Sequence, residues 1–372
     1  MRRTRITTLA TVVAATSMLV GGAVSAQSPA ASMAATGWKV GVVTDVGTLD
    51  DHNFNQFSWE GAVRGAADIG GTADNIVTTS SADYAKNIQT FVDNGANVIV
   101  TIGFAMGDST LAAAKAHPEI KFIGVDQGIC VDATGANDPT FACAGDPAVL
   151  YPNYQGVVFA EAQPGYLAGI VAANVSKSQH IAVIGGASFI PAVANYANGY
   201  AAGAKSVNPD IKVETQYVSD DLGKAFNDPA GGKAFAEQLL QLYPDIDVVF
   251  QAAGKTGNGV LQAVCDAKAS NPDMWGIGVD VDQHLSTPES DACILTSAEK
   301  KLSNAVDSAV IAAANGTAVG GNVLYNAANN GIGLSPYYDF ASAITPETQA
   351  AVDAAFAAFA AGTLDPLASP AP

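Results

Sequence analysis

Acidic side chains follow several short apolar segments of this chain. They are Asp45, Asp50 and Asp51 after the first such segment, and Asp126 and Asp280 after two later ones. Carboxylates can bind hard cations, or accept hydrogen bonds from the hydroxyl and ring N–H groups of a ligand. A single acid at the end of a strand is more often a turn residue or a helix cap. The repetition of the pattern is what indicates a ligand site.

Phosphate binding is the first chemistry to test, because Gly254-Lys255-Thr256 ends like a P-loop. That loop requires another glycine five residues before Gly254, and Val249 occupies the position. The sequence therefore does not support a P-loop.

Metal-dependent hydrolysis is the second chemistry, because three acids crowd the end of the first apolar segment. Their spacing is similar to that of nucleoside hydrolases, whose motif D-x-D-x-x-x-D-D is one residue longer and has an acid where Gly47 stands. Without that acid a calcium site would be incomplete. A hydrolase-like enzyme stays an alternative, but we expect no catalytic residue, metal or cofactor.

The scaffold that positions these acids is predicted from the alternation of short apolar runs with longer Ala-rich segments. This alternation is typical of parallel strands joined by helices, and ligands bind beyond the carboxyl ends of such strands. The expected strands are 39–44, 98–103, 122–125, 157–159, 181–184, 248–250, 277–279 and 294–296. The expected helices are 54–69, 84–94, 109–116, 165–175, 192–206, 231–242, 257–268, 300–314 and 346–361.

An interruption of this alternation over residues 127–154 predicts two lobes. The segment contains Pro, Asn, Asp and two cysteines, and we interpret it as a surface excursion that precedes a second lobe. Several crossings of the chain between the lobes would make a hinged cleft. We expect the N-terminal lobe to contain residues 38–155 and 291–320. The expected C-terminal lobe contains 156–290 and 321–362, and a tail follows over 363–372.

The first 26 residues have the features of an export signal. Three arginines precede an apolar run over 9–24, and residues 24–26 are small enough for signal cleavage. We expect residues 1–26 to be a signal peptide and 27–37 a flexible leader. Because no cysteine precedes Cys130, a lipid anchor on an N-terminal cysteine is excluded. The sequence therefore predicts an exported, periplasmic or extracellular protein that is not such a lipoprotein.

Charge and cysteine content narrow the class of protein further. Removing the signal peptide takes away three arginines and no acids, which changes the formal net charge from −18 to about −21. Such acidity argues against nucleic acid as a partner. Four cysteines in an exported chain indicate two disulfides, for which three connectivities are possible. Pairing of nearest neighbours closes the shorter loops and is preferred, joining Cys130 to Cys143 and Cys265 to Cys293.

A binding cleft is the third interpretation, and a family resemblance supports it. Residues 43–47, 50–51, 54–56 and 59–61 resemble the opening motif of the basic membrane protein family, the PnrA-like substrate-binding proteins of ABC importers. The best-understood members bind purine nucleosides. The resemblance continues in order at 103–104, 159–169, 185–191, 199–205, 226–229, 252–259, 278–283 and 295–300.

The resemblance implies an α/β fold of the two-lobed type I periplasmic-binding-protein class. Its parallel sheets, with flanking helices, would close on a hinge around a small-molecule ligand. The implied partner is an ABC permease in the membrane, and we expect a monomer without a cofactor. Riboflavin or a sugar stays open as an alternative ligand, and so does the identity of the base.

Roles at the base are also implied by the resemblance. Phe54 and Phe226 match two phenylalanines that hold the base from opposite lobes. Asp126 matches a carboxylate that faces the edge of the base, with Asn53 or Asn55 completing the recognition.

Roles at the sugar follow from the same resemblance. Asp280 matches the acid that accepts from paired ribose hydroxyls, and Lys300 would donate to the sugar. Gly254 would let the backbone approach the sugar closely. Asp45 either contacts the ligand or caps the following helix.

Three departures from the family pattern concern the hinge, the excursion and the sugar loop. Gln163-Pro164 stands where an acid and a glycine are usual, and the insertion 127–153 is longer than expected. Lys255 replaces a common glycine in the loop near the sugar.

Overall fold

The computed structural model describes residues 37–138, 140 and 142–367. The predicted signal peptide 1–26 lies outside the described residues, and so does the predicted leader except for Gly37. Within the described part of the chain, no helix is long and apolar enough to cross a membrane.

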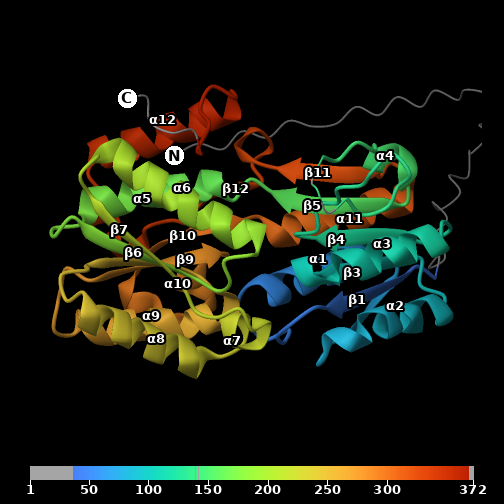
Figure 1. Ribbon diagram of the computed structural model, residues 1–372, viewed down its shortest axis with the longest axis horizontal. Helices are drawn as coiled ribbons and strands as arrows, with labels where there is room; N and C mark the ends of the chain where they lie inside the picture. Colours follow the sequence, from blue (N-terminus) through green and yellow to red (C-terminus); the bar gives the residue numbers. More distant parts are fainter. Residues whose placement is uncertain (1–36, 139, 141, 368–372) are drawn as a thin grey trace, which may run out of the picture. The chain divides into compact units, whose positions relative to one another are not determined.

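A first sheet of six strands has the spatial order β11-β5-β4-β3-β1-β2, and all neighbouring strands are parallel (Figure 1). The central strands are almost entirely buried, as expected where helices cover both faces of a sheet. The strands are β1 Lys39–Thr44, β2 Thr72–Ile76, β3 Val98–Ile102, β4 Lys121–Val125, β5 Tyr154–Phe159 and β11 Gly321–Tyr325.

A second sheet of six strands has the order β12-β10-β9-β8-β6-β7. It is parallel except for its edge strand β12, which runs antiparallel to β10. The strands are β6 His180–Gly185, β7 Lys212–Tyr217, β8 Val248–Ala252, β9 Trp275–Asp280, β10 Ile294–Lys300 and β12 Ile332–Leu334.

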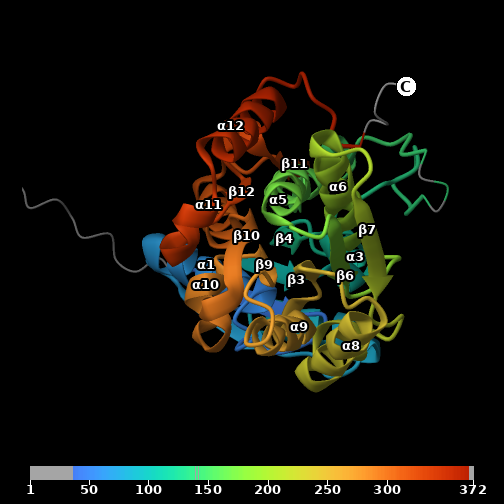
Figure 2. The same cartoon turned by 90° about the vertical axis from the view of Figure 1, so that its left-hand side faces the viewer.

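Helices cover both faces of each sheet. In the second sheet, α5 and α6 lie on one face and α8 and α9 on the other (Figure 2). In the first, α1 and α11 pack on the face opposite to α2 and α3. The helices are α1 Phe54–Asp68, α2 Tyr84–Asp93, α3 Gly107–Ala116, α4 Pro147–Leu150, α5 Ala162–Val175, α6 Pro191–Val207, α7 Leu222–Phe226, α8 Pro229–Leu242, α9 Gly254–Lys268, α10 Gln283–Ser286, α11 Leu302–Asn315 and α12 Pro346–Ala360.

Two glycines set the close packing of α5 against α6. A Cβ at Gly169 would lie 2.1 Å from the carbonyl oxygen of Tyr200, and one at Gly203 would lie 1.9 Å from that of Tyr166. Any larger residue would push the helices apart. The pair α5–α6 covers β6, β8 and β10 and so supports the strands that carry the second half of the site.

The chain passes between the sheets three times, after β5, after β10 and between β11 and β12. Sheet membership differs from the expected lobe ranges at these points. The strand β10 was expected in the N-terminal lobe but pairs with β9, and β11 was expected in the C-terminal lobe but pairs with β5. All of β5 belongs to the first sheet, although the expected boundary fell at 155/156. The pairing of strands next to a crossing depends on distant backbone partners, which a local pattern does not contain.

Several strands were not foreseen at all. They are β2, β7, β11 and β12, which lie at sheet edges. Three of them, β2, β7 and β11, carry mixed polar sequences with partly exposed side chains, whereas β12 is apolar but only three residues long. An edge strand is covered less completely than a central strand. It therefore lacks the continuous apolar run from which the central strands were predicted.

The disulfides join Cys130 to Cys143 and Cys265 to Cys293, the nearest-neighbour pairing preferred from the sequence. The first closes the excursion between β4 and β5. The second ties α9 to the start of β10. The excursion is also held to the first sheet by Asn322 on β11, which exchanges two hydrogen bonds with the backbone of Ile129 at 2.8 and 2.9 Å.

Candidate ligand site

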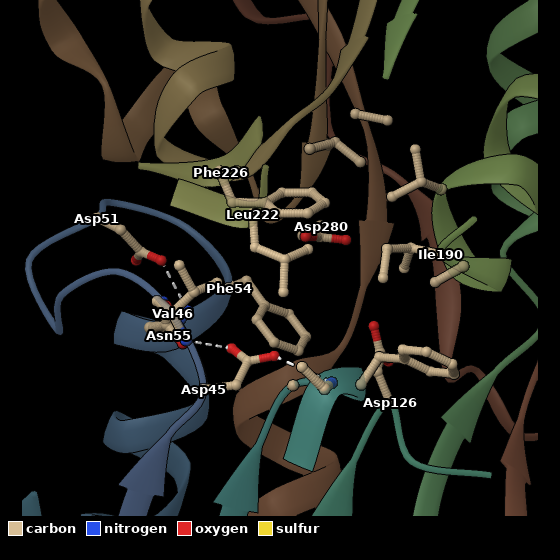
Figure 3. Close-up of a pocket in the computed structure, with 18 of the residues that line it drawn as sticks. Asp45, Val46, Asp51, Phe54, Asn55, Asp126, Ile190, Leu222, Phe226 and Asp280 are labelled. Carbon is tan, nitrogen blue, oxygen red and sulfur yellow. Dashed lines mark hydrogen bonds between the residues drawn. The ribbon is translucent and has the colours of Figure 1, made fainter. Parts of the chain in front are cut away.

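A pocket lies between the carboxyl edges of the two sheets (Figure 3). Loops after β1, β3 and β4 form one side, and residues at or after the ends of β6, β7, β8, β9 and β10 form the other. The lining residues are Asp45, Val46, Asp51, Phe54, Asn55, Gly103, Phe104, Ala105, Asp126, Ile190, Ala192, Val193, Tyr196, Leu222, Phe226, Ala252, Gly254, Val279, Asp280 and Lys300.

The structure brings together all the expected ligand-binding residues except Asn53. The side chain of Asn53 is buried beside the pocket rather than in its lining, and neither of its polar atoms has a hydrogen-bond partner among the described residues. Asn55 does line the pocket, and its amide donates to the carbonyl of Val46 at 3.0 Å. Of the two asparagines proposed for base recognition, the structure places Asn55 where a ligand could reach it.

The acids of the first loop have separate partners. Asp51 caps α1, because its carboxylate accepts from the backbone N–H groups of Asn53, Asn55 and Gln56 at 2.9–3.0 Å. Asp50 accepts instead from Lys255, at 3.2 Å. Asp51 therefore stabilises the start of α1, and Asp50 forms an ion pair with Lys255.

Asp45 lies at the bottom of the pocket, and it is Asp51 that caps the following helix. The carboxylate of Asp45 accepts from the N–H groups of Val46 at 2.6 Å and Ala105 at 3.3 Å. Burial raises its pKa to about 7, although these hydrogen bonds lower it. Gly103 makes the arrangement possible. It has φ +107°, and a Cβ there would lie 2.0 Å from the carboxylate.

Two phenyl rings enter the pocket from different sheets. Phe54 begins α1 on the first-sheet side, and Phe226 ends α7 on the second-sheet side. Both rings project into the pocket, and Leu222 lies between them in the view of Figure 3. Gly186 leaves room for Phe226, since a Cβ at Gly186 would lie 2.3 Å from its ring. The rings offer two apolar faces that remain partly accessible.

A buried charged cluster, named here the Lys300 cluster, consists of Lys300, Asp126, Asp280 and Glu161. The ammonium of Lys300, whose side chain is 2 % exposed, contacts the carboxylate of Asp126 directly. It lies 3.6 Å from Glu161 and 3.6 Å from Asp280. An ammonium has three N–H groups, so the expected donation from Lys300 to a sugar would compete with three carboxylates.

Asp280 is positioned by Tyr196, whose hydroxyl donates to its carboxylate at 3.2 Å and lies 3.1 Å from the carbonyl of Ala298. Asp280 ends β9 and Asp126 directly follows β4, and both have positive φ, at +65° and +57°. This is an uncommon conformation outside glycine. One oxygen of Asp126 is buried without a partner in the part of the chain that the structure describes. That oxygen is a free acceptor at the pocket wall.

Burial shifts the acid–base properties of the cluster. It raises the pKa of Glu161 to about 7 and that of Asp280 to about 6, while Lys300 lowers both and Asp126 raises both. Burial disfavours the charged form of Lys300 and so lowers its pKa. Attraction by the carboxylates of Asp126, Asp280 and Glu161 outweighs this effect, so the pKa of Lys300 lies above its usual value.

A second contact between the two sides of the pocket lies at its rim. We call this the Lys255 rim, consisting of Lys255, Thr48 and Asp50. The ammonium of Lys255 at the start of α9 donates to Thr48 at 3.0 Å and to Asp50 at 3.2 Å. The departure from glycine at this position therefore makes a contact with the opposite loop. The neighbouring Gly254 has φ +52° and lines the pocket.

Sequence reasoning missed two kinds of site residue. The apolar wall formed by Ile190, Val193 and Leu222 comes from ordinary helix and loop positions with no distinguishing signal. Glu161 had a signal, because it follows β5 as the other acids follow their strands.

Known proteins resemble this chain over most of its length. A family model described as "ABC transporter substrate-binding protein PnrA-like" (Bmp) matches residues 38–354. The chain belongs to this family. It is 32% identical to the "ABC transporter nucleoside-binding protein BmpA" of Lactococcus lactis subsp. cremoris (strain MG1363), over 80% of this chain and 82% of that protein. It is 30% identical to "Basic membrane protein A" of Borreliella burgdorferi (strain ATCC 35210 / DSM 4680 / CIP 102532 / B31), over 72% of this chain and 70% of that protein.

Solved structures show the same fold. A solute-binding protein of an ABC transporter system from Aeropyrum pernix K1 superimposes with a TM-score of 0.73 at 22% identity, covering 87% of this chain and 92% of that one. A solute-binding protein from Conexibacter woesei DSM 14684 superimposes with a TM-score of 0.63 at 24% identity, covering 88% of this chain and 98% of that one. These findings confirm the predicted family and the two-lobed periplasmic-binding fold. Membership implies a small-molecule ligand, an ABC permease as partner and export from the cytoplasm.

Proposed function

We propose that this protein captures a purine nucleoside in the pocket between its lobes and delivers it to an ABC permease in the membrane. In this proposal it works as an exported monomer. Its lobes are those defined by the two sheets.

The observation that carries the proposal is the pair Phe54 and Phe226, which enter one pocket from different lobes. Two flat apolar faces suit a purine ring, which they can desolvate by stacking. The relative from Lactococcus lactis, named as a nucleoside-binding protein, supports the same ligand class.

Polar recognition in this proposal comes from acceptors around the rings. The free oxygen of Asp126 accepts from an N–H group of the base, and Asn55 lies on the same side of the pocket. Asp280 accepts from ribose hydroxyls, and Gly254 lets the backbone lie close to the sugar. Asp45 provides a further acceptor deep in the pocket.

We further propose that the protein binds its ligand without converting it. The acids that would form a hydrolase-like metal site have other partners, since Asp51 caps α1 and Asp50 pairs with Lys255. Incubation of the protein with inosine and calcium checks this. Release of hypoxanthine above the rate of the protein-free control would establish an enzyme.

Calorimetry with a ligand panel tests the nucleoside assignment. The panel contains adenosine, inosine, guanosine, the free base adenine, riboflavin and D-arabinose. The proposal expects saturable binding of at least one purine nucleoside, tighter than that of the free base. Binding of riboflavin or the sugar alone would overturn it.

A further inference from the structure

The Lys300 cluster contains more acids than cations. One ammonium faces the carboxylates of Asp126, Glu161 and Asp280, and all four side chains are nearly or fully buried. The rings of Phe54, Phe159 and Tyr196 surround the ammonium at 5.3–5.6 Å from their centroids. Little water can reach the cluster to screen the charges, so each carboxylate affects the others.

Glu161 differs from the other two acids in its position. It stands between β5 and α5, where the chain passes from the first sheet to the second, and its side chain is 6 % exposed. Asp126 and Asp280 line the pocket, whereas Glu161 lies behind it and reaches Lys300 from the crossing segment. Its second oxygen is 3.5 Å from the amide of Asn195 on α6. Glu161 can therefore affect a ligand only through its neighbours.

We propose that Glu161 is a positioning residue for ligand capture, competing with Asp126 and Asp280 for the ammonium of Lys300 and so making capture dependent on pH. The inference rests on the proposed function, because it needs a ligand whose hydroxyl or N–H groups donate to these two carboxylates. A full negative charge on Glu161 draws Lys300 away from the pocket acids, and its neutral form releases the ammonium to them.

The charged and titratable groups around Glu161 come from four elements. Lys300 on β10, Asp126 after β4 and Tyr196 on α6 face Glu161, and Asp280 on β9 shares the ammonium of Lys300 with it. Beyond them, Asp45 faces Asp126. Since burial raises the pKa of Glu161 to about 7 and of Asp280 to about 6, the cluster holds protons that exchange near neutrality. A ligand that donates to Asp280 favours its ionised form, so capture releases protons and strengthens as pH rises.

Calorimetric titration with adenosine or inosine, whichever binds more tightly, at pH 5, 6, 7 and 8 tests the proposal. With a pKa of about 6, Asp280 is only about one-tenth ionised at pH 5. Wild-type affinity should therefore be about tenfold lower at pH 5 than at pH 8. Glu161→Gln should bind like the wild type at pH 5, where Glu161 is already mostly protonated, but about threefold more weakly at pH 8, where the ammonium of Lys300 stays with Asp126 and Asp280. The affinity of this variant should therefore change only about threefold over the same range.

Two further variants separate charge from structure. Glu161→Asp keeps the charge and should keep the wild-type pH profile. Glu237→Gln makes the same chemical change as Glu161→Gln at an exposed position on α8 and should also leave the profile unchanged. A Glu161→Gln profile that coincides with that of the wild type overturns the proposal.

A measurement on the wild type alone tests the proposal even if the Glu161→Gln protein does not fold. Titrations at pH 6.5 in two buffers with different ionisation enthalpies count the protons released on binding. The proposal expects release, and a count of zero overturns it. Nucleoside binding with no pH dependence overturns only this inference, whereas absence of nucleoside binding at every pH overturns the proposed function as well.

Discussion

Among the contacts between the two lobes are two lysine–carboxylate contacts that differ mainly in burial. In the Lys300 cluster the lysine is 2 % exposed and Asp126 is 10 % exposed. In the Lys255 rim the lysine is 25 % exposed and Asp50 is 80 % exposed. Both lysines belong to the second-sheet side and both acids to the first. The same pair of charged groups should therefore contribute very differently to stability, because water screens one contact and is excluded from the other.

Removal of the buried cation should have the largest effect. Lys300→Met leaves three buried carboxylates without their counter-ion, and loss of one partner of a buried pair costs about 3–5 kcal/mol. The midpoint of urea unfolding, followed by circular dichroism at pH 8 with the disulfides oxidised, measures this cost. A Lys300→Met protein as stable as the wild type would contradict the idea that the cluster depends on its cation.

Loss of one ring should weaken ligand binding without much change in stability. Stacking of a base on an aromatic side chain is worth about 1–3 kcal/mol, so Phe226→Ala should weaken purine nucleoside binding by about 5- to 150-fold. The ring is partly exposed in the pocket, which limits the cost to the empty protein.

Phe235→Ala is the matched control for this change, because Phe235 is a partly buried residue of α8 outside the pocket lining. Calorimetry should give it wild-type affinity. If both variants bind the nucleoside equally well, the aromatic clamp is wrong.

A change of pH should affect the stabilising contributions of the buried acids near the pocket and of Asp50 in the Lys255 rim in opposite directions. The pKa values of Asp45, Glu161 and Asp280 are raised by burial, so their favourable contribution to folding is present at low pH and lost as pH rises through about 6–7. The pKa of Asp50 is lowered by Thr48 and Lys255, so its contribution is lost only when pH falls below its usual value.

Thermal denaturation of the ligand-free protein checks these signs. The melting temperature should be higher at pH 5 than at pH 8, by about 2–5 °C. A melting temperature that rises from pH 5 to pH 8 would show that the buried acids are not the dominant titrating groups.

Removal of the exposed cation should have the smallest effect. An exposed ion pair contributes under about 1 kcal/mol and is screened by salt. Lys255→Met should therefore shift the urea midpoint only slightly at low salt, and not at all in 1 M NaCl. A loss comparable to that of Lys300→Met would remove the distinction between the cluster and the rim.

Most of the candidate site was predictable because its residues follow recognisable strands. The acids Asp45, Asp126 and Asp280 stand at the ends of buried apolar runs, and carboxyl ends of parallel strands meet at one edge. The phenylalanines Phe54 and Phe226 depended on family resemblance, since nothing in their local pattern distinguishes them from core residues.

Other parts of the site were not predictable from local patterns. Asn53 was expected beside the ligand, but its side chain is buried outside the pocket lining, and its backbone N–H donates to the carboxylate of Asp51. Lys300 was expected to donate to a sugar, and its three carboxylate neighbours come from residues 20 to 174 positions away in the chain.

The sequence by itself determined the fold class, the central strands and the edge at which polar groups gather. Apolar runs are local properties of the chain, and such runs become the buried central strands of parallel sheets. Only the tertiary structure decided which sheet each crossing strand joins and which charges share one buried space. These depend on distances between residues far apart in sequence. Acids at strand ends indicate a ligand site, and their packing around a single lysine is what gives them different roles.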